Sequence, residues 1–277
     1  MAVYALRAIT AFDLLAVEIG TATLVLWAAL AVVGPRTSRR WGVYALLGLM
    51  EPALSYLLYD LGLARTSAIH AALLESLEAP FVVILGVVLL REKVRAALVV
   101  ALGLGLAGAA LVSLPSGDGG PDRATALGDL LVVLAIAVAA FYSIAVNRFG
   151  ADDPSLTVTS FQFLAASCAL APVVAGSWVL HASRLPGAGH GYLVAAVASG
   201  VLGTAGAYLL FNVGITRTSA SAAGLTLNLI PVFGTVAAVV GLGEHLQTLE
   251  IVGGALILAS LLGLHFASRT ADRRRPL

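Results

Sequence analysis

The chain has 277 residues, of which 60% are apolar and 11% are charged, and its mean hydropathy is +0.98. A soluble domain is about 45–50% apolar and about 25% charged, so this composition excludes a soluble fold, a disordered chain and a coiled coil. The net charge of +1 indicates no nucleic-acid partner, and the single cysteine, Cys168, excludes a disulfide framework and a cysteine-based metal site. The sequence therefore predicts a protein embedded in lipid.

The chain contains nine stretches long enough to cross a membrane, since a spanning helix needs about 20 mostly apolar residues. They are too long and unbroken for the alternating strands of an outer-membrane barrel. Backbone groups in lipid must bond to one another, so we expect an all-α membrane protein. In chain order, the predicted spans are about 13–33, 41–63, 67–90, 96–114, 127–147, 156–176, 190–212, 219–242 and 248–266.

The basic residues predict how these spans are oriented. If the carboxyl-terminal tail is cytoplasmic, twelve Lys and Arg residues fall in inside segments and four in outside segments. Basic loops stay in the cytoplasm, so we expect the carboxyl terminus inside and the amino terminus outside. Arg outnumbers Lys fifteen to one, a usage typical of GC-rich bacterial genomes, so the expected location is the bacterial inner (plasma) membrane.

The chain also repeats itself. Residues 59–81 and 211–233 are identical at nine of 23 positions with an offset of 152, including the Arg-Thr-Ser-Ala blocks that begin at Arg65 and Arg217. Two lipid-facing helices of similar composition would explain the apolar matches but not this block. An odd number of predicted spans, five, separates equivalent points, so the two copies have opposite orientations. Inverted repeats are typical of transporters, with the substrate site near mid-membrane.

This repeat predicts the domain organisation. We expect a first five-helix unit over 1–114, a linker over 115–126, a second unit over 127–266 and a basic tail over 267–277. Matching Val17-Glu18-Ile19 to Phe161-Gln162-Phe163, at an offset of 144, makes residues 1–7 the last turns of an opening helix that is otherwise missing. We therefore expect residues 1–7 to form at most a stub.

These features resemble the EamA type of the drug/metabolite transporter (DMT) superfamily. The resemblance rests on the inverted repeat, the paired Gly-x-x-Arg-Thr-Ser-Ala segments, a Pro-x-Phe at Pro231 and a Glu-x-Leu at Glu244, conservatively varied at Glu92. It implies a ten-helix fold with both ends cytoplasmic, a central cavity built from the third, fourth, eighth and ninth helices, and export of amino acids or other small metabolites. The chain departs from the family at its first helix and at Glu18, where many members have Arg.

Ionisable groups near mid-membrane are the first candidates for function, because each costs about 2.5–3.5 kcal/mol on insertion. Glu51 and Glu78 lie near the middle of their spans, and Glu75 lies one turn from Glu78 on the same predicted helical face. No Lys or Arg lies within any predicted span, so these acids have no basic partner there unless His70 serves. A proton relay or a cation site is one interpretation; neutral acids that hydrogen-bond to neighbouring helices are the other.

Other polar residues complete the predicted site. Tyr208, Asn212 and Asn228 are buried candidates of the second half, and Tyr56 is a candidate for an apolar wall. Acids on one side and amides on the other would suit an amine-bearing or zwitterionic solute. No metal ligand set and no cofactor motif are predicted.

Four further polar residues are expected near the ends of their spans. Glu18 is placed about one turn inside its helix, and His70 is placed at the membrane interface. Asp13 and Asp60 are expected to be solvated.

Prolines and glycines predict irregular or close packing. Pro52, Pro80 and Pro231 fall near the middle of their spans, where they would make hinges or static kinks. The Gly-rich span 96–114 and the Gly253-Gly254 pair predict closely packed helices.

The sequence thus favours a secondary transporter that exports a small metabolite such as an amino acid by alternating access, with proton coupling an open option. The alternative within this class is a multidrug or cationic-compound efflux permease. A membrane enzyme is disfavoured because hydrolase and protease motifs are absent, and a channel because no filter segment is present; a nucleotide-binding Gly-x-x-x-x-Gly-Lys motif is also absent. Substrate identity, transport direction, coupling ion and oligomeric state are left open.

Overall fold

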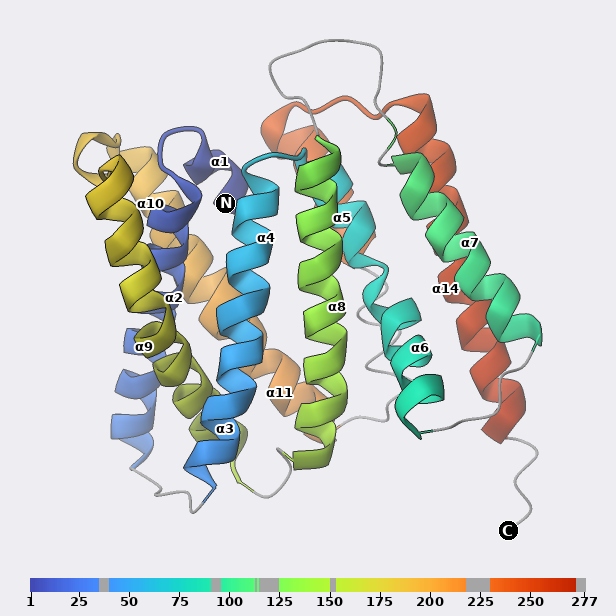
Figure 1. Ribbon diagram of the computed structural model, residues 1–277, viewed down its shortest axis with the longest axis horizontal. Helices are drawn as coiled ribbons and strands as arrows, with labels where there is room; N and C mark the ends of the chain where they lie inside the picture. The colour runs from blue at the N-terminus through green and yellow to red at the C-terminus, as the bar shows by residue number, and fades with distance from the viewer. Residues whose placement is uncertain are drawn as a thin grey trace. The chain divides into compact units, whose positions relative to one another are not determined.

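A computed structural model describes residues 1–34, 40–90, 96–112, 114, 125–149, 153–217 and 230–272, and every regular element in these ranges is a helix (Figure 1). The chain divides into two compact units. The first unit is Met1–Ala64 with Tyr142–Thr218, and the second is Arg65–Phe141 with Ser219–Leu277. Each unit therefore combines two segments that are far apart in the chain.

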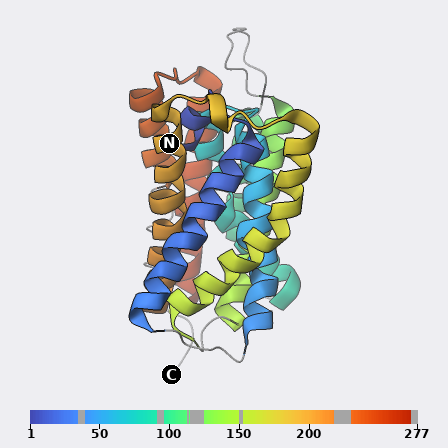
Figure 2. The ribbon, with the colours of Figure 1, turned by 90° about the vertical axis from the view of Figure 1, so that its left-hand side faces the viewer.

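The first unit is built around two long helices, α2 and α9, with the interrupted helices of both halves beside them (Figure 2). Its elements are α1 (Ala2–Leu6), α2 (Ala11–Val33), α3 (Trp41–Gly48), the π-helical turn η1 (Leu49–Leu54), α4 (Ser55–Leu63), the end of α8 (Ala126–Phe149), α9 (Ser155–His181), the 3-10 turn η2 (Leu185–Gly187), α10 (His190–Ala198), the π-helical segment η3 (Ser199–Gly206) and α11 (Ala207–Arg217).

The second unit consists of shorter helices and one long pair. Its elements are α5 (Ala68–Glu75), α6 (Glu78–Leu90), α7 (Ala96–Val112), the first part of α8, α13 (Ile230–Ala237), the π-helical turn η4 (Ala238–Leu242) and α14 (Thr248–Asp272). Residues 218–229, which include the start of the predicted span 219–242, lie outside the described residues.

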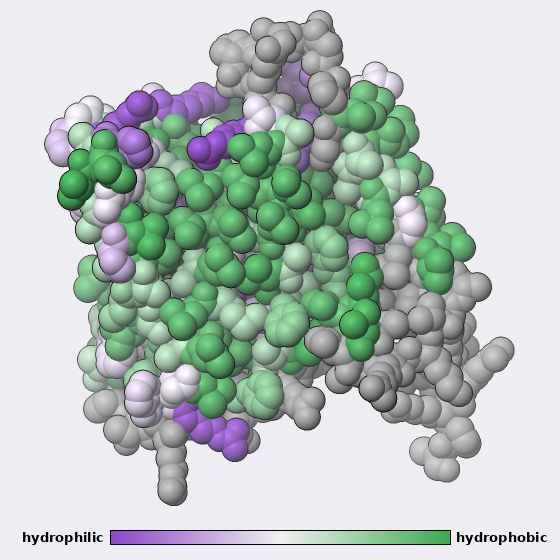
Figure 3. Space-filling view, in the orientation of Figure 1, coloured by the Kyte–Doolittle hydropathy of each residue, from purple (hydrophilic) through white to green (hydrophobic). Residues whose placement is uncertain are grey.

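Five of the described helices are long and apolar enough to cross a membrane: Ala11–Val33, Trp41–Leu63, Ala126–Val146, Ser155–His181 and His190–Phe211. Their large apolar side chains face outward, as at Leu24 (72% exposed) and Val179 (86% exposed). On the face that Figure 3 shows, hydrophobic side chains cover the middle and hydrophilic ones gather near the upper and lower ends. Such a surface is stable in lipid and not in water, so the chain is an all-α, multi-pass membrane protein.

Prolines interrupt two of the predicted spans. Glu51 has extended backbone angles (φ −143°, ψ 120°) inside the span 41–63, directly before Pro52, since a proline disfavours the α conformation in the preceding residue. The predicted span 67–90 is interrupted as well: α5 ends at Glu75 and α6 begins at Glu78. Pro80 cannot donate a backbone hydrogen bond to the carbonyl four residues earlier, which favours the break.

Contacts in the first unit fit the predicted inverted repeat. Thr23 and Ser167, which are equivalent at the offset of 144, share a hydrogen bond of 2.7 Å between their hydroxyl groups. α2 and α9 run antiparallel there, since the Trp27 indole donates to the Ser160 carbonyl at 3.0 Å. Equivalent residues that meet one another are expected on the two-fold axis of an inverted repeat.

Two equivalent glycines make the same kind of close contact. A Cβ atom on Gly200 would lie 2.9 Å from Glu18 Cα, and one on Gly48 would lie 2.6 Å from Gln162 Cα. Gly48 and Gly200 are equivalent at an offset of 152, and Glu18 and Gln162 at 144. Only glycine allows the backbones to approach this closely at both places.

The second unit is held together by the close pair of α7 and α14. A Cβ on Gly108 would lie 2.6 Å from the Gly253 carbonyl oxygen, and one on Gly105 would lie 2.8 Å from Ser260 Oγ. The Ser260 hydroxyl donates to the Ala101 carbonyl at 2.6 Å, so the two helices run antiparallel. The predicted close packing is confirmed at Gly105, Gly108 and Gly253, but not at Gly103, which has open space around it.

The opening residues form a short helix, as expected from the repeat. α1 covers five residues and packs on α10, where the rings of Tyr4 and Tyr192 stack with centroids 4.8 Å apart. Ile9 and Leu14 join it in a small core.

Candidate functional site

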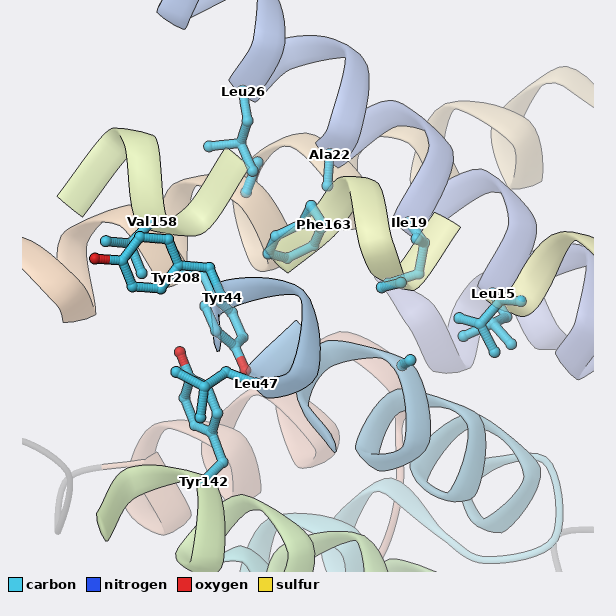
Figure 4. Close-up of a cluster of buried hydrophobic side chains, with 14 of the residues drawn as sticks. Leu15, Ile19, Ala22, Leu26, Tyr44, Leu47, Tyr142, Val158, Phe163 and Tyr208 are labelled. Atoms are coloured by element: carbon cyan, nitrogen blue, oxygen red, sulfur yellow. The ribbon is translucent and has the colours of Figure 1, made fainter. Parts of the chain in front are cut away.

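Tyr208 lies at the centre of an aromatic group in the core of the first unit (Figure 4). Its ring centroid is 5.3 Å from that of Phe163 in an edge-to-face contact, 6.2 Å from Tyr142 and 6.3 Å from Tyr56. Tyr56 and Tyr208 are equivalent residues of the two halves. The structure thus brings together two of the predicted site residues.

Glu51 is the predicted acid that joins this aromatic group. It lies at the break between α3 and α4, and its carboxylate neighbours the hydroxyl groups of Tyr208 and Tyr56. The break takes the Glu51 backbone out of the helical hydrogen-bond ladder at mid-span. Broken helices lined by such residues are typical of transporter substrate sites.

Two further acids extend the group, and we call Glu18, Glu51 and Asp60 the acidic cluster. Glu18 is 3% exposed on α2, and its carboxylate accepts a hydrogen bond from the Ser199 hydroxyl of η3. Asp60 is 2% exposed on α4 and lies within electrostatic reach of Glu18 and Tyr56. The expectation that Asp60 is solvated is therefore wrong, because its side chain is buried on a helix that packs against α2.

Asp13 is likewise buried, at 0% exposed, and the expectation that it is solvated is wrong. Its carboxylate accepts hydrogen bonds from the Thr10 and Arg184 amides, the Trp178 indole and the Ser183 hydroxyl, at 2.6–3.1 Å. It caps α2 and joins that helix to the end of α9. Every oxygen of this acid has a donor, so its role is structural.

The remaining predicted site residues lie elsewhere. Glu75 and Glu78 belong to the second unit, at the end of α5 and the start of α6, so they do not share one helical face as predicted. Asn212 lies on α11, and its side chain is outside the described part of the structure, as is the whole of Asn228.

The second unit contains a buried cluster of its own, which we call the histidine triad. His70 Nδ1 lies 3.1 Å from Asp129 Oδ2, and its Nε2 lies 3.0 Å from Glu250 Oε1. Thr66 also donates to Asp129. All three triad residues are 3–5% exposed, so His70 is a buried partner of two acids. The triad joins the first turns of α5, α8 and α14.

Glu244 of the Glu-x-Leu motif also has a structural role. Its two carboxylate oxygens accept hydrogen bonds from the backbone amides of Ala68 and Ile69, at 3.0 and 2.9 Å. These are orphan donors at the start of α5, and a negative charge there also stabilises the helix dipole.

Comparison with known proteins assigns the chain. The model of the EamA-like transporter family matches residues 1–114 and 126–266. The chain belongs to this family. This EamA-like transporter is 30% identical over 254 residues to a probable terminal-alkyne amino-acid exporter of Streptantibioticus cattleyicolor, covering 89% of the chain and 79% of the relative. It is 27% identical to an uncharacterized transporter of Archaeoglobus fulgidus, covering 88% of the chain and 84% of the relative.

The fold is also that of a solved protein. A crystal structure at 23% sequence identity superimposes with a TM-score of 0.67 and covers 98% of this chain and 92% of its own. This EamA-like transporter is therefore a membrane transporter with a known all-α fold.

Sequence reasoning missed four of the buried polar residues of this transporter. Asp60 lies one helical turn after Tyr56, and that i, i+4 spacing on an apolar helix was the available signal. Asp129, Glu250 and His70 each lie in the first turn of a helix, where a polar residue is usually a cap or an interface residue. Nothing in the linear sequence says that these three turns meet.

Proposed function

We propose that this transporter exports a small amine-bearing metabolite, such as an amino acid, by alternating access. The observation that carries the proposal is the acidic cluster beside Tyr56 and Tyr208. A carboxylate next to aromatic faces suits an ammonium group, which gains both charge pairing and cation–π attraction. The amino-acid exporter among the relatives supports the same class of solute.

Glu51 is the acid we assign to the ammonium group of the solute. It lies at a helix break near mid-span and beside both tyrosines. Glu75, Glu78, Asn212 and Asn228 stay predicted contributors. Coupling to protons is part of the proposal, since an acid that binds a cation on one face and releases it on the other can also carry a proton.

We further propose that the protein lies in the bacterial inner membrane with its carboxyl terminus cytoplasmic. A reporter fused after Pro276 is expected to read cytoplasmic, and one inserted near Asp118 external. Two reporters on the same side would contradict the inverted topology.

An efflux assay tests the transport proposal. Cells that express the full chain and are loaded with dipeptides should release one or more of the constituent amino acids faster than control cells. Glu51→Gln should reduce this release at least tenfold at an unchanged protein level, and Asp153→Asn, a change in an acid that accepts from the Tyr44 hydroxyl at 2.7 Å, should not. Equal release by wild type and Glu51→Gln would remove Glu51 from the site.

The same cells separate the second candidate function. The acidic cluster would also suit a lipophilic organic cation, so the cells are tested for resistance to ethidium. Ethidium resistance that depends on Glu51, without amino-acid release, would identify a cationic-compound efflux permease instead.

A further inference from the structure

Glu18 and Asp60 form a pair of acids within the acidic cluster. They lie on α2 and α4, which pack together, and the Glu18 carboxylate interacts electrostatically with that of Asp60. In the described part of the chain, neither forms an ion pair with a basic side chain. Two buried carboxylates that face each other do not both stay ionised, because their repulsion adds to the cost of burial.

The hydrogen bonds of the two acids differ. Glu18 accepts from the Ser199 hydroxyl, whereas Asp60 Oδ2 is fully buried and has no hydrogen-bond donor among the described residues. A buried acceptor without a donor costs about 1–3 kcal/mol, and more when it is charged. A proton on Asp60 Oδ2 removes the buried charge, which is the larger part of this cost. This unpartnered oxygen is the observation, independent of the clustering, that indicates a bound cation.

The inverted repeat separates the packing role of these positions from their charge. The equivalent of Glu18 is Gln162, and the equivalent of Asp60 is Asn212. Each amide has nearly the size of the acid it replaces. The Gly48 and Gly200 contacts show that Glu18 and Gln162 also occupy equivalent packing positions. The packing at the Glu18 and Gln162 positions is thus the same with and without a charge, and only the first half has a charged residue at these two pairs of positions.

The surroundings of the pair favour a proton over a metal ion. No group of three or more His, Cys, Asp or Glu residues that could hold a metal ion is found among the described residues. The charged and titratable groups that act on the pair, or on the Tyr56 that both acids influence, are Glu51 from η1 and the chain's amino terminus. Ser199 and Thr204 add neutral hydroxyl groups from η3.

We propose that Glu18 and Asp60 are a proton-binding pair, with the proton on Asp60 and Glu18 ionised, and that this pair couples transport to proton movement. In each cycle Asp60 releases its proton to water on one face of the membrane and takes another from water on the other face. Only the O–H bond breaks and forms, so no oxidant or other reactant is needed. The coupling part rests on the proposed function; the proton-binding part does not.

Infrared spectroscopy of the purified full-length protein tests proton binding without a substrate. The wild type at neutral pH should show the carbonyl stretch of a protonated carboxyl group. Asp60→Asn should remove the contribution of one such group, and Asp153→Asn should leave the spectrum unchanged. An unchanged carboxyl band in folded Asp60→Asn, or no such band in the wild type, would overturn the proposal.

A second variant keeps the test valid if Asp60→Asn does not fold. Glu18→Gln removes the negative neighbour, so Asp60 should lose its proton at a lower pH than in the wild type, by about one pH unit or more. An unchanged midpoint would show that the two acids are not a pair.

Proteoliposomes that contain a pH-sensitive dye test whether transport is coupled to proton movement. L-leucine is the first probe, and the other amino acids are tried in turn if L-leucine is not transported. In the wild type, a gradient of a transported amino acid should drive protons across the membrane. Asp60→Asn should still transport the amino acid, but proton movement should be at least tenfold smaller. Undiminished proton movement in Asp60→Asn would overturn the coupling. If the wild type transports no amino acid, the proposed function fails, and the infrared result alone decides the proton site.

Discussion

The two units bury acids in opposite ways. In the second unit, Asp129 and Glu250 share the imidazole of His70 at 3.1 and 3.0 Å. In the first unit, Glu18 and Asp60 face each other with no basic side chain between them among the described residues. A buried acid with a partner contributes to the fold, whereas a buried acid without one costs stability and is retained for another reason. We therefore expect the histidine triad to stabilise the fold, and we propose that the pair of Glu18 and Asp60 is retained for transport.

The largest expected effect comes from removing the partner in the histidine triad. His70→Leu leaves Asp129 and Glu250 buried with no counter-charge, which should lower the free energy of unfolding by about 3–5 kcal/mol. Thermal unfolding of the purified protein in detergent measures this loss. Adding Asp129→Asn and Glu250→Gln to His70→Leu should restore most of it, and no recovery would show that the triad contributes through packing rather than charge.

Asp13 extends the comparison, because it is a buried acid of the first unit whose two carboxylate oxygens both accept hydrogen bonds. Asp13→Ala removes an acceptor from four described donors and breaks the capping box that Asp13 forms with the N-cap Thr10, so we expect a loss of about 3 kcal/mol, near the upper value for one charged hydrogen bond. The same unfolding measurement reports it. A loss below about 1 kcal/mol would mean that hydrogen bonding does not distinguish the structural acids from the functional ones.

Gly200 tests whether the acidic cluster tolerates any change in its packing. Gly200→Ala places a methyl group against the Glu18 backbone, and overpacking of this kind costs about 1–3 kcal/mol. Gly20→Ala is the matched control, because Gly20 lies on α2 and a methyl group there would have nothing within 4 Å. This control variant should be neutral or slightly stabilising. Equal unfolding temperatures for the two variants would contradict the close approach of α2 and η3.

The smallest stability effect is expected at Asp60. Asp60→Asn keeps the size of the side chain and replaces a protonated, neutral carboxyl group by a neutral amide, so the free energy of unfolding should change by less than about 1 kcal/mol or rise slightly. The measurement is again thermal unfolding, compared with His70→Leu under identical conditions. A loss as large as that of His70→Leu would place Asp60 among the structural acids.

The sequence predicts the all-α membrane fold well, because long apolar runs and a repeated Arg-Thr-Ser-Ala block are local signals. It also locates Glu51, Tyr56 and Tyr208, whose place follows from span position and repeat register. It does not predict where the span 67–90 is interrupted: Pro80 predicts a hinge or kink, but the helix breaks before this proline, between Glu75 and Glu78. Asp60 and the triad are missed because their burial depends on which helix ends pack together, and residues far apart in the chain decide that.

The interleaving of the chain between the two units has a consequence for biosynthesis. The first unit combines Met1–Ala64 with Tyr142–Thr218, and the second combines Arg65–Phe141 with Ser219–Leu277. Neither unit is complete when the ribosome finishes the first half, although domains generally fold as units from the amino terminus. Nascent helices α2 to α4 must therefore wait in the bilayer for α9 and α11, with the acids of the acidic cluster not yet enclosed. Two half-chains made in one cell should assemble into a working transporter, whereas the first half made alone should be degraded.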